Sequence, residues 1–143
     1  MKKILADVNV ILDVLLDRKP HAEASAVVWA AVESGMVEGL LSAHAVTTIH
    51  YLIRKEKGTA EARKTLSAIL SLFAVAPVDN TVIQEALRLP CSDFEDAVTA
   101  AAARLADCDS IVSRDIKGFR GSRVPCLTPE AMAPLLNTAF PPR

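Results

Sequence analysis

Four aspartates stand where apolar segments end or a helix begins. Asp7 closes the apolar run "KILAD", and Asp115 comes two residues after the apolar run "DSIVS". Asp93 and Asp96 open a helical segment and, three residues apart, share one of its faces. Carboxylates gathered at one place repel each other, so their pKa values rise unless a cation neutralises them. These residue types therefore predict a site for a hard divalent ion, Mg²⁺ or Mn²⁺, that activates water and stabilises charge on a phosphate.

Each of these acids also has a purely structural interpretation. Ser92 with Glu95 fits the S-x-x-E capping box, in which acids of the first turn suit the helix dipole. Asp7 is equally able to cap the helix that follows it, and Asp115 to occupy a polar turn. The argument for chemistry is the coincidence of acids at two strand ends and one helix start.

Two further aspartates, Asp13 and Asp17, interrupt the apolar segment "NVILDVLLD". Val10, Ile11, Val14 and Leu15 follow helical spacing there, which leaves both aspartates on the polar side of the helix. A charged side chain is almost never fully buried without a partner. We therefore expect Asp13 and Asp17 to be solvated or bonded to a neighbouring arginine.

The elements that must position these residues alternate along the chain. Short apolar runs predict strands at residues 3–7, 38–43, 109–113 and 123–127, with a further apolar run at 73–77. Helical patterns cover residues 9–17, 21–35, 44–57, 60–72, 80–89, 92–108 and 128–136. Such alternation favours an α/β fold with a mainly parallel central sheet between two layers of helices. In such sheets ligands bind at the carboxyl ends of the strands, where Asp7, Ser42 and the segment 113–115 would meet.

Composition sets the limits of the fold. The 143 residues predict one domain over residues 1–136, with a C-terminal tail at 137–143. Hydrophobic residues make up 51% and charged residues 23%, which excludes a disordered chain. The three cysteines are isolated, which argues against a disulfide framework or a structural zinc site and for a reducing cytosol. Asp7 and Asn9 break any export signal, and no run reaches the roughly 20 apolar residues of a membrane span, so we expect a cytoplasmic protein without a membrane partner.

Two stretches carry a resemblance to a known family. "ILADVNVILDVLLDR" resembles the opening of PIN-domain proteins, especially the VapC-like toxin branch, with its strand, D-x-N and helix. "SDFEDAVTAAAARLADCDSIVSRDIKGF" is similar to the second half of that family, where an acidic helix start precedes a strand ending in S/T-R-D/N. Together the matches span most of the chain. The resemblance implies a three-layer α/β/α fold and an Mg²⁺- or Mn²⁺-dependent ribonuclease.

The resemblance also implies roles for particular residues. Asp7, Asp96 and Asp115 match the first, third and fourth family acids and are the expected catalytic residues. Asp93 matches an additional acid of some branches and joins them as an expected metal ligand. Asn9 and Ser113 occupy supporting polar positions beside the cluster.

One position departs from the family pattern. The family places an acid, commonly glutamate, six residues beyond the serine that ends the second strand, and that count from Ser42 arrives at Thr48. Thr48 offers a hydroxyl or holds a water but adds no charge. We expect reduced metal affinity and a preference for Mn²⁺, with Asp93 as a compensating ligand.

A basic segment follows the last acid. Its sequence, "SRDIKGFRGSR", contains four cations that are candidates for binding substrate phosphate: Arg114, Lys117, Arg120 and Arg123. A basic loop beside an acidic metal site suits a nucleic-acid backbone. A solvated surface loop with scattered charge is the alternative interpretation.

Three functions remain open from the sequence. The first is an endoribonuclease of a toxin–antitoxin pair, cutting exposed single-stranded RNA; here the resemblance implies a small antitoxin partner and a homodimer. The second is a degenerate PIN module that binds RNA or protein without cutting, which the threonine at position 48 favours. The third is a haloacid-dehalogenase-type phosphatase with Asp7 as nucleophile, although Asn9 stands where that chemistry needs a second aspartate.

Overall fold

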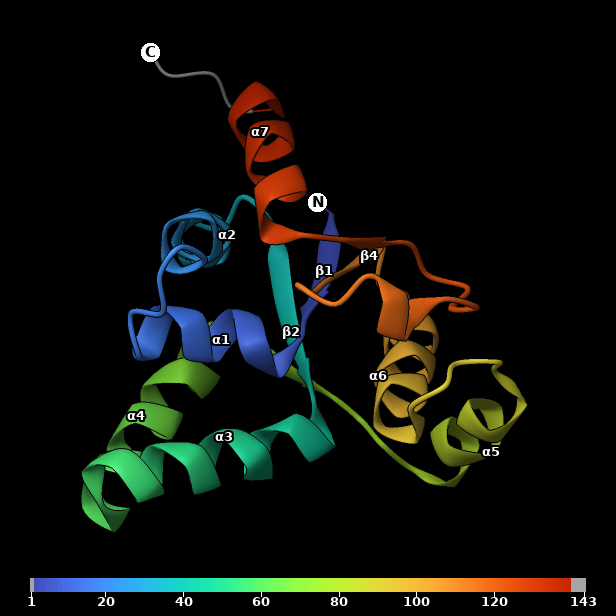
Figure 1. The fold of residues 1–143 in the computed structure, drawn as a ribbon, viewed down its shortest axis with the longest axis horizontal. Helices are drawn as coiled ribbons and strands as arrows, with labels where there is room; N and C mark the ends of the chain where they lie inside the picture. The colour runs from blue at the N-terminus through green and yellow to red at the C-terminus, as the bar shows by residue number, and fades with distance from the viewer. Residues whose placement is uncertain (1, 140–143) are drawn as a thin grey trace.

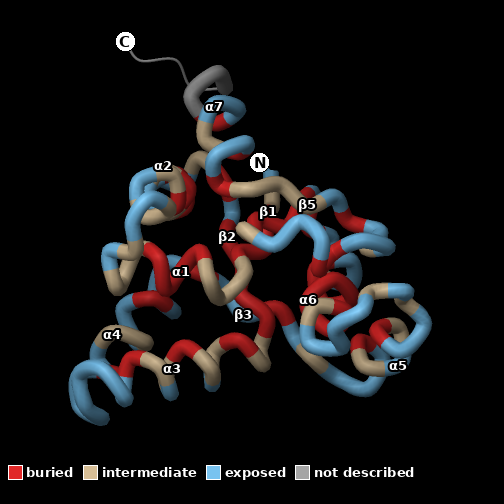
Figure 2. Tube along the Cα trace, viewed as in Figure 1, coloured by how far each residue is buried: buried red, intermediate tan, exposed pale blue. Residues whose placement is uncertain are grey.

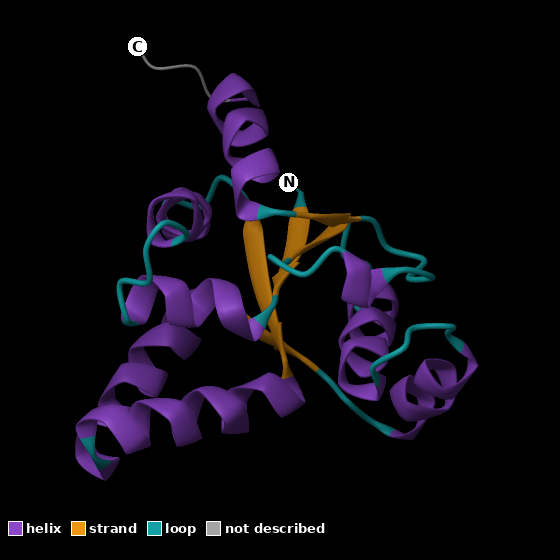
Figure 3. Ribbon diagram, viewed as in Figure 1, coloured by secondary structure: helices purple, strands orange, loops and turns teal. Residues whose placement is uncertain are grey.

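A five-stranded parallel sheet forms the centre of the molecule (Figures 1 and 3). The computed structural model describes residues 2–139, and the side chains as far as Leu136. The strands are β1 (Lys3–Ala6), β2 (Glu38–Ser42), β3 (Ala74–Ala76), β4 (Ser110–Val112) and β5 (Cys126–Leu127). Their order in the sheet is β3-β2-β1-β4-β5, and every neighbouring pair is parallel. The predicted parallel α/β sheet is confirmed.

Helices cover both faces of this sheet. They are α1 (Val8–Leu15), α2 (Ala22–Glu33), α3 (Ala43–Lys57), α4 (Thr59–Leu72), α5 (Asn80–Arg88), α6 (Phe94–Leu105) and α7 (Pro129–Ala139), with a 3₁₀ turn η1 (Lys117–Phe119). One face carries α1, α2, α3, α4 and α7, whereas α5, α6 and η1 lie on the other (Figure 1). This is the three-layer arrangement expected from the alternating strand and helix segments.

Two hydrophobic cores follow from the alternation of side chains along each strand. Ile4 and Ala6 of β1 face the layer of α1–α4, whereas Leu5 between them faces α5 and α6. Buried residues follow the strands and the inner faces of the helices in Figure 2. On the second face, α6 presents buried alanines at 97 and 100–103, whose small side chains let the helix lie close to the sheet. Burial on both faces explains why the strand segments are almost continuously apolar.

The topology marks one edge of the sheet as the place for a ligand. From the central β1 the chain proceeds outward through β2 and β3, then returns to the other side of β1 with β4. The order therefore reverses between β1 and β4. In open parallel sheets, ligands bind at the carboxyl ends of the strands at such a reversal. Asp7 and Ser113 are the first residues beyond the carboxyl ends of β1 and β4.

The predicted segments agree with the structure to within a few residues. The segment expected as an edge strand at 123–127 pairs with β4 only at Cys126–Leu127. The last helix runs to Ala139, three residues into the expected tail, and residues 140–143 lie outside the described part of the chain. The three cysteines are free thiols. None of the helices described between residues 2 and 139 combines the length and the hydrophobicity needed to cross a membrane.

Candidate active site

Asp7 is held by hydrogen bonds on both of its carboxylate oxygens. It is the N-cap of α1, where Oδ1 accepts a hydrogen bond from the backbone N–H of Val8 at 2.9 Å. Its Oδ2 accepts one from the amide of Asn9 at 3.0 Å and one from the hydroxyl of Ser113 at 2.8 Å. Asp7 therefore caps α1 as the structural interpretation predicts. The hydrogen bonds from Asn9 and Ser113 orient its carboxylate at the carboxyl edge of the sheet.

The segment after β4 places Asp115 beside this group. The hydroxyl oxygen of Ser113 accepts a hydrogen bond from the backbone N–H of Asp115 at 3.1 Å, and Asp115 Oδ1 accepts one from the N–H of Gly118, also at 3.1 Å. A β-carbon at Gly118 would lie 2.6 Å from Asp115 Oδ2 and closer still to Asp96 Oδ2. The carboxylates of Asp96 and Asp115 thus approach each other next to the bare α-carbon of Gly118, a position that only glycine fills without displacing them.

The electrostatics of the acids agree with this proximity. Burial and then, in decreasing order, the charges of Asp7, Asp93 and Asp115 together raise the pKa of Asp96 to about 6. Burial is also the main reason why the pKa of Asp7 is raised; its hydrogen bond from Ser113 acts in the opposite direction, and the charge of Asp115 adds to the increase. Each acid therefore lies within electrostatic reach of the others, as a cluster that binds a cation requires.

Asp93 caps the helix that carries Asp96. Its Oδ1 accepts a hydrogen bond from the backbone N–H of Asp96 at 3.1 Å, and α6 begins at Phe94. The predicted capping box of Ser92 with Glu95 is therefore wrong by one residue, since the cap is Asp93. Asp93 is exposed, so its charge acts on Asp96 from the solvent side of the cluster.

Asp13 differs from the expectation of a solvated residue. It is fully buried, and its Oδ1 accepts a hydrogen bond from Arg114 Nη2 at 3.2 Å while Arg114 Nε lies 2.8 Å from Oδ2. The alternative prediction, a neighbouring arginine as partner, is confirmed for this residue. Asp17 is exposed, as expected. The ion pair connects α1 to the segment that contains Asp115. It also occupies the guanidinium of Arg114, one of the four cations predicted to bind substrate phosphate.

The other cations of the basic segment remain exposed. These exposed cations are Lys117, Arg120 and Arg123. Lys117 begins the 3₁₀ turn after Asp115, and the two arginines follow that turn. They stay candidates for phosphate contacts, whereas Arg114 is fixed twice, through its guanidinium on Asp13 and through its backbone N–H, which Asn9 Oδ1 accepts at 3.3 Å.

The junction of β2 and α3 contributes a residue that the sequence reasoning missed. Ser42 ends β2, and the register of β1 and β2, carried two residues further, sets it beside Asp7. His44 follows in the first turn of α3, and its charge acts on Asp7. Thr48 is half-buried one turn later, on the same helix face as His44. His44 has no metal-binding spacing to the other histidines in the sequence, and its spacing of four from Thr48 is the one signal that connects it to this position.

The donor set suits an ion that keeps part of its water shell. Among residues with described side chains, no group of three or more acids, histidines or cysteines is arranged so that it could hold a metal ion. Asp96 and Asp115 nevertheless have oxygens beside one point, and Asp7 is close enough to raise the pKa of Asp96. Mg²⁺ and Mn²⁺ sites commonly use one or two carboxylates, with water and substrate phosphate completing the coordination. The residues present fit such an ion.

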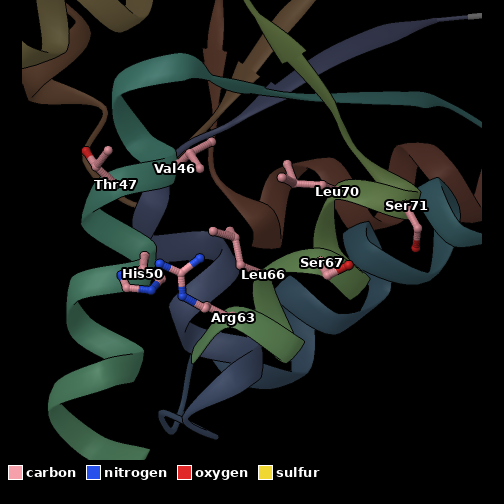
Figure 4. Close-up of a pocket in the computed structure, with 8 residues that line it drawn as sticks. All are labelled: Val46, Thr47, His50, Arg63, Leu66, Ser67, Leu70 and Ser71. Atoms are coloured by element: carbon pink, nitrogen blue, oxygen red, sulfur yellow. The ribbon is translucent and has the colours of Figure 1, made fainter. Parts of the chain in front are cut away.

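A separate groove lies between α3 and α4 (Figure 4). It has a volume of about 680 Å³ and is lined by residues that include Thr47, His50, Arg63 and Leu66. None of the acids of the cluster lines it. The groove therefore marks a surface distinct from the acidic cluster.

Comparison with known sequences places the chain in a family. The PIN domain family model matches residues 3–117. Ribonuclease VapC1 of Aquifex aeolicus (strain VF5) is 25% identical over 145 residues, an alignment that covers 96% of this chain and 97% of that protein. The relative is thus similar in length as well as in sequence.

Solved structures share the fold. FitAcB from Neisseria gonorrhoeae superposes with a TM-score of 0.73 at 22% identity, covering 89% of this chain and 98% of that one. VapBC2 from Rickettsia felis, solved with a DNA fragment from its promoter, gives 0.67 at 12% identity, covering 88% and 98%. PAE2754 from Pyrobaculum aerophilum gives 0.65 at 16% identity, covering 96% and 90%. With its parallel sheet, the acids at the carboxyl edge of that sheet and a family match over most of its length, this chain belongs to the PIN domain family.

Proposed function

We propose that this protein is a divalent-metal-dependent endoribonuclease that hydrolyses phosphodiester bonds of RNA. The observation that carries the proposal is the convergence of Asp7, Asp96 and Asp115, which come from the end of β1, the start of α6 and the segment after β4. A full-length relative named as a ribonuclease supports RNA as the substrate.

The three acids have distinguishable parts in this function. Asp96 and Asp115 approach the same point beside Gly118 and are the residues best placed to hold an ion. Asp7 is oriented by its bonds to Asn9 and Ser113 and adds negative charge. A divalent ion bound there would supply an activated water and stabilise charge on the scissile phosphate. Asp93 supports the group indirectly, by capping α6 and by its charge.

The substrate backbone would be held beside these acids. Lys117, Arg120 and Arg123 are exposed on the segment that follows Asp115 and are free to reach flanking phosphates. Contacts of this kind position a nucleic acid without reading its sequence. Arg114, engaged by the buried Asp13, has a structural part in the same segment.

The biological role we propose is that of the toxin in a toxin–antitoxin pair. The solved structures of similar fold include one described as a toxin–antitoxin complex from Klebsiella pneumoniae and a DNA-bound VapBC from Salmonella typhimurium. By analogy, the protein would bind a small antitoxin, form a homodimer and act in the cytoplasm. This part of the proposal rests on likeness of fold.

Cleavage of labelled single-stranded RNA tests the enzymatic proposal. With Mn²⁺ or Mg²⁺ the protein should cut, EDTA should stop the reaction, and the double variant Asp7→Asn/Asp96→Asn should lower the rate by about 100-fold or more. Asp17→Asn is the matched control, because it neutralises an exposed aspartate a short distance along the same chain segment and should leave the rate unchanged. Cleavage that persists in the double variant would contradict the proposal.

The lack of an acid at position 48 favours a second candidate function, a PIN module without catalytic activity. Thr48 gives no charge to the site, and no group of three or more acids, histidines or cysteines among the described residues is arranged to hold a metal ion. A non-catalytic PIN module would bind RNA with the same dependence on Lys117, Arg120 and Arg123 but would never cut it. Tight binding without cleavage under either ion would select that function over the ribonuclease.

A further inference from the structure

The segment of residues 113–115 lies outside the strands and helices. It follows Val112, the last residue of β4, and precedes the 3₁₀ turn η1. The backbone N–H of Ser113 still donates to the carbonyl of Leu127 at 3.0 Å, and the pairing of β4 with β5 goes no further. An irregular segment lacks the repeated backbone hydrogen bonds of a strand or helix, so other contacts must fix its conformation. The position of Asp115 therefore depends on the bonds that this segment makes.

Arg114, in the middle of the segment, is held through both its main chain and its side chain. Its backbone N–H donates to Asn9 Oδ1 at 3.3 Å, and its Nη2 donates to Asp13 Oδ1 at 3.2 Å. Arg114 Nε and Asp13 Oδ2 lie 2.8 Å apart as an ion pair. Asn9 and Asp13 are four residues apart on α1, so they share one face of that helix. A single face of α1 thus holds Arg114 at two points.

The residues on either side of Arg114 reach the acidic cluster. Ser113 donates its hydroxyl to Asp7 Oδ2 at 2.8 Å. The carboxylate of Asp115 approaches that of Asp96 at the bare α-carbon described above. A shift of the main chain at Arg114 would therefore move a hydrogen-bond partner of one acid and the carboxylate of another.

The burial of this ion pair indicates a role in geometry. Asp13 is 0% exposed, and the side chain of Arg114 is 30% exposed. Replacing a buried ion pair by apolar residues of similar volume is often neutral or stabilising, so stability alone is a weak reason for such a pair. A planar guanidinium, in contrast, pairs with a carboxylate in a defined orientation. The pair joins α1 to the segment that carries Asp115, where orientation matters most.

We propose that Arg114 is a positioning residue, which Asp13 holds so that the carboxylate of Asp115 stays at the acidic cluster. The inference deepens the proposed function and rests on it. It gives Arg114 a role other than the phosphate contact predicted from the sequence, because a carboxylate already engages its guanidinium. Displacing a catalytic group by about 1 Å costs roughly 100-fold in rate. Loss of the ion pair should therefore lower kcat by about that factor and leave RNA affinity unchanged.

The double variant Asp13→Val/Arg114→Met removes the pair without leaving a buried charge, so it should stay folded. With Mn²⁺ and saturating RNA its kcat should fall about 100-fold, while KM and the salt dependence of RNA binding stay as in the unaltered protein. Arg104→Met is the matched control and should change none of these quantities, because Arg104 pairs with Glu85 between α5 and α6.

Arg114→Lys is a milder variant that keeps the charge and loses the planar guanidinium. It should show a smaller fall in kcat, again at unchanged KM. A phosphate contact would give the opposite pattern in the double variant: weaker RNA binding and a salt slope reduced by about 0.7, the contribution of one contact to a single strand.

Amide hydrogen exchange gives a second measurement that does not depend on cleavage. The N–H of Asp115 donates to Ser113 Oγ, and the N–H of Gly118 donates to Asp115 Oδ1. Both amides should exchange at least about tenfold faster in the double variant, because the segment opens locally more often. The N–H of Ile111, which donates to the carbonyl of Pro125 within the sheet, should keep its rate.

The outcomes separate this inference from the proposed function. Unchanged exchange at Asp115 and Gly118 would overturn the inference, as would normal kcat in the folded double variant. Weaker RNA binding with a reduced salt slope at normal kcat would assign Arg114 to a phosphate and overturn it too. If the unaltered protein cuts no RNA, the ribonuclease proposal fails, whereas faster exchange in the double variant would still support the positioning of this segment by Arg114.

Discussion

The two sides of Asp7 are built differently. On the β4 side, comprising Asn9, Ser113, Arg114 and Asp115, the hydroxyl of Ser113 donates to Asp7 and accepts from the N–H of Asp115, and Arg114 Nη2 donates to Asp13. Arg114 Nε and Asp13 Oδ2 lie 2.8 Å apart as an ion pair without a hydrogen bond. On the β2 side, comprising Ser42, His44 and Thr48, two buried polar atoms are unpaired. A satisfied network fixes positions, whereas an unsatisfied one is completed by a ligand. The contrast is that hydrogen bonds and an ion pair join the residues of the β4 side to Asp7 and Asp13, whereas the hydroxyl of Ser42 on the β2 side has no partner.

The largest effect is expected from breaking the ion pair of the β4 side. Asp13→Asn removes the charge that pairs with Arg114, and loss of one partner of a buried pair costs 3–5 kcal/mol. Arg114 retains 30% side-chain exposure, so we expect the lower end, about 3 kcal/mol. Urea unfolding measures it, with Asp17→Asn as the control, since that exposed residue should change stability by less than about 0.5 kcal/mol. Equal effects of the two variants would show that the pair is not what stabilises the β4 side.

Gly118→Ala disturbs the same side without touching a charge. The added methyl group would push apart the carboxylates of Asp96 and Asp115, which both approach that position. A displacement of about 1 Å in a catalytic group costs roughly 100-fold in rate. We expect RNA cleavage to fall by about that factor while the protein remains folded. The adjacent exposed Lys117→Ala is a control for disturbance of the loop, and it should change substrate affinity more than turnover. Unaltered cleavage by Gly118→Ala would show that the two carboxylates do not act together.

The two serines beside Asp7 give the most direct comparison of the sides. Ser113 is fully buried and Ser42 is 1% exposed, so truncation to alanine removes the same atom from equally buried places. Ser113→Ala leaves Asp7 Oδ2 and the N–H of Asp115 short of a partner and should cost about 2 kcal/mol. Ser42→Ala removes a hydroxyl that has no partner and should cost less than about 0.5 kcal/mol in metal-free buffer. Thermal unfolding measures the loss of stability in each variant. Similar losses in Ser113→Ala and Ser42→Ala would contradict the difference between the two sides of Asp7.

The β4 side was also the more accessible to sequence reasoning. Asp7 and Asp115 each follow an apolar run, so the rule for parallel sheets predicted that they would lie at the same edge. The pairing of Asp13 with Arg114 was open among alternatives because 101 residues separate them and only tertiary packing selects the partner. The cap of α6 was misplaced by one residue because Ser92 and Asp93 are equally good capping residues. The roles of the site residues stay predictions.

His44 shows why the β2 side was harder to anticipate. An isolated histidine has no metal-binding spacing in the sequence, and its significance comes from Thr99 and Glu95, which lie on another helix. The absence of the acid at Thr48 was visible in the sequence, but the contact between His44 of α3 and Thr99 of α6 was not. Pattern rules identify residues at the ends of strands, whereas side-chain contacts between elements far apart in the sequence appear only in the folded structure.

The smallest effect is a pH-dependent one, and it measures the burial of Asp96 together with the repulsion from its neighbouring acids. Asp96 has a pKa of about 6 in the folded protein against an ordinary value of 3.8. Its contribution to stability is therefore complete below about pH 4 and is lost as the pH rises through about 6, because the folded state then gives up a proton that it binds more tightly than the unfolded state. Asp96→Asn removes this dependence. After allowance for solvent screening at a partly exposed carboxylate, we expect the variant to be more stable than the unaltered protein by about 1 kcal/mol at pH 8 and by nothing near pH 4. Urea unfolding across this range in EDTA tests it, since a bound ion would reverse the sign. A stability difference that stays constant with pH would mean that neither burial nor the neighbouring carboxylates raise the pKa of Asp96, and the proposed cation-binding cluster would lose its physical basis.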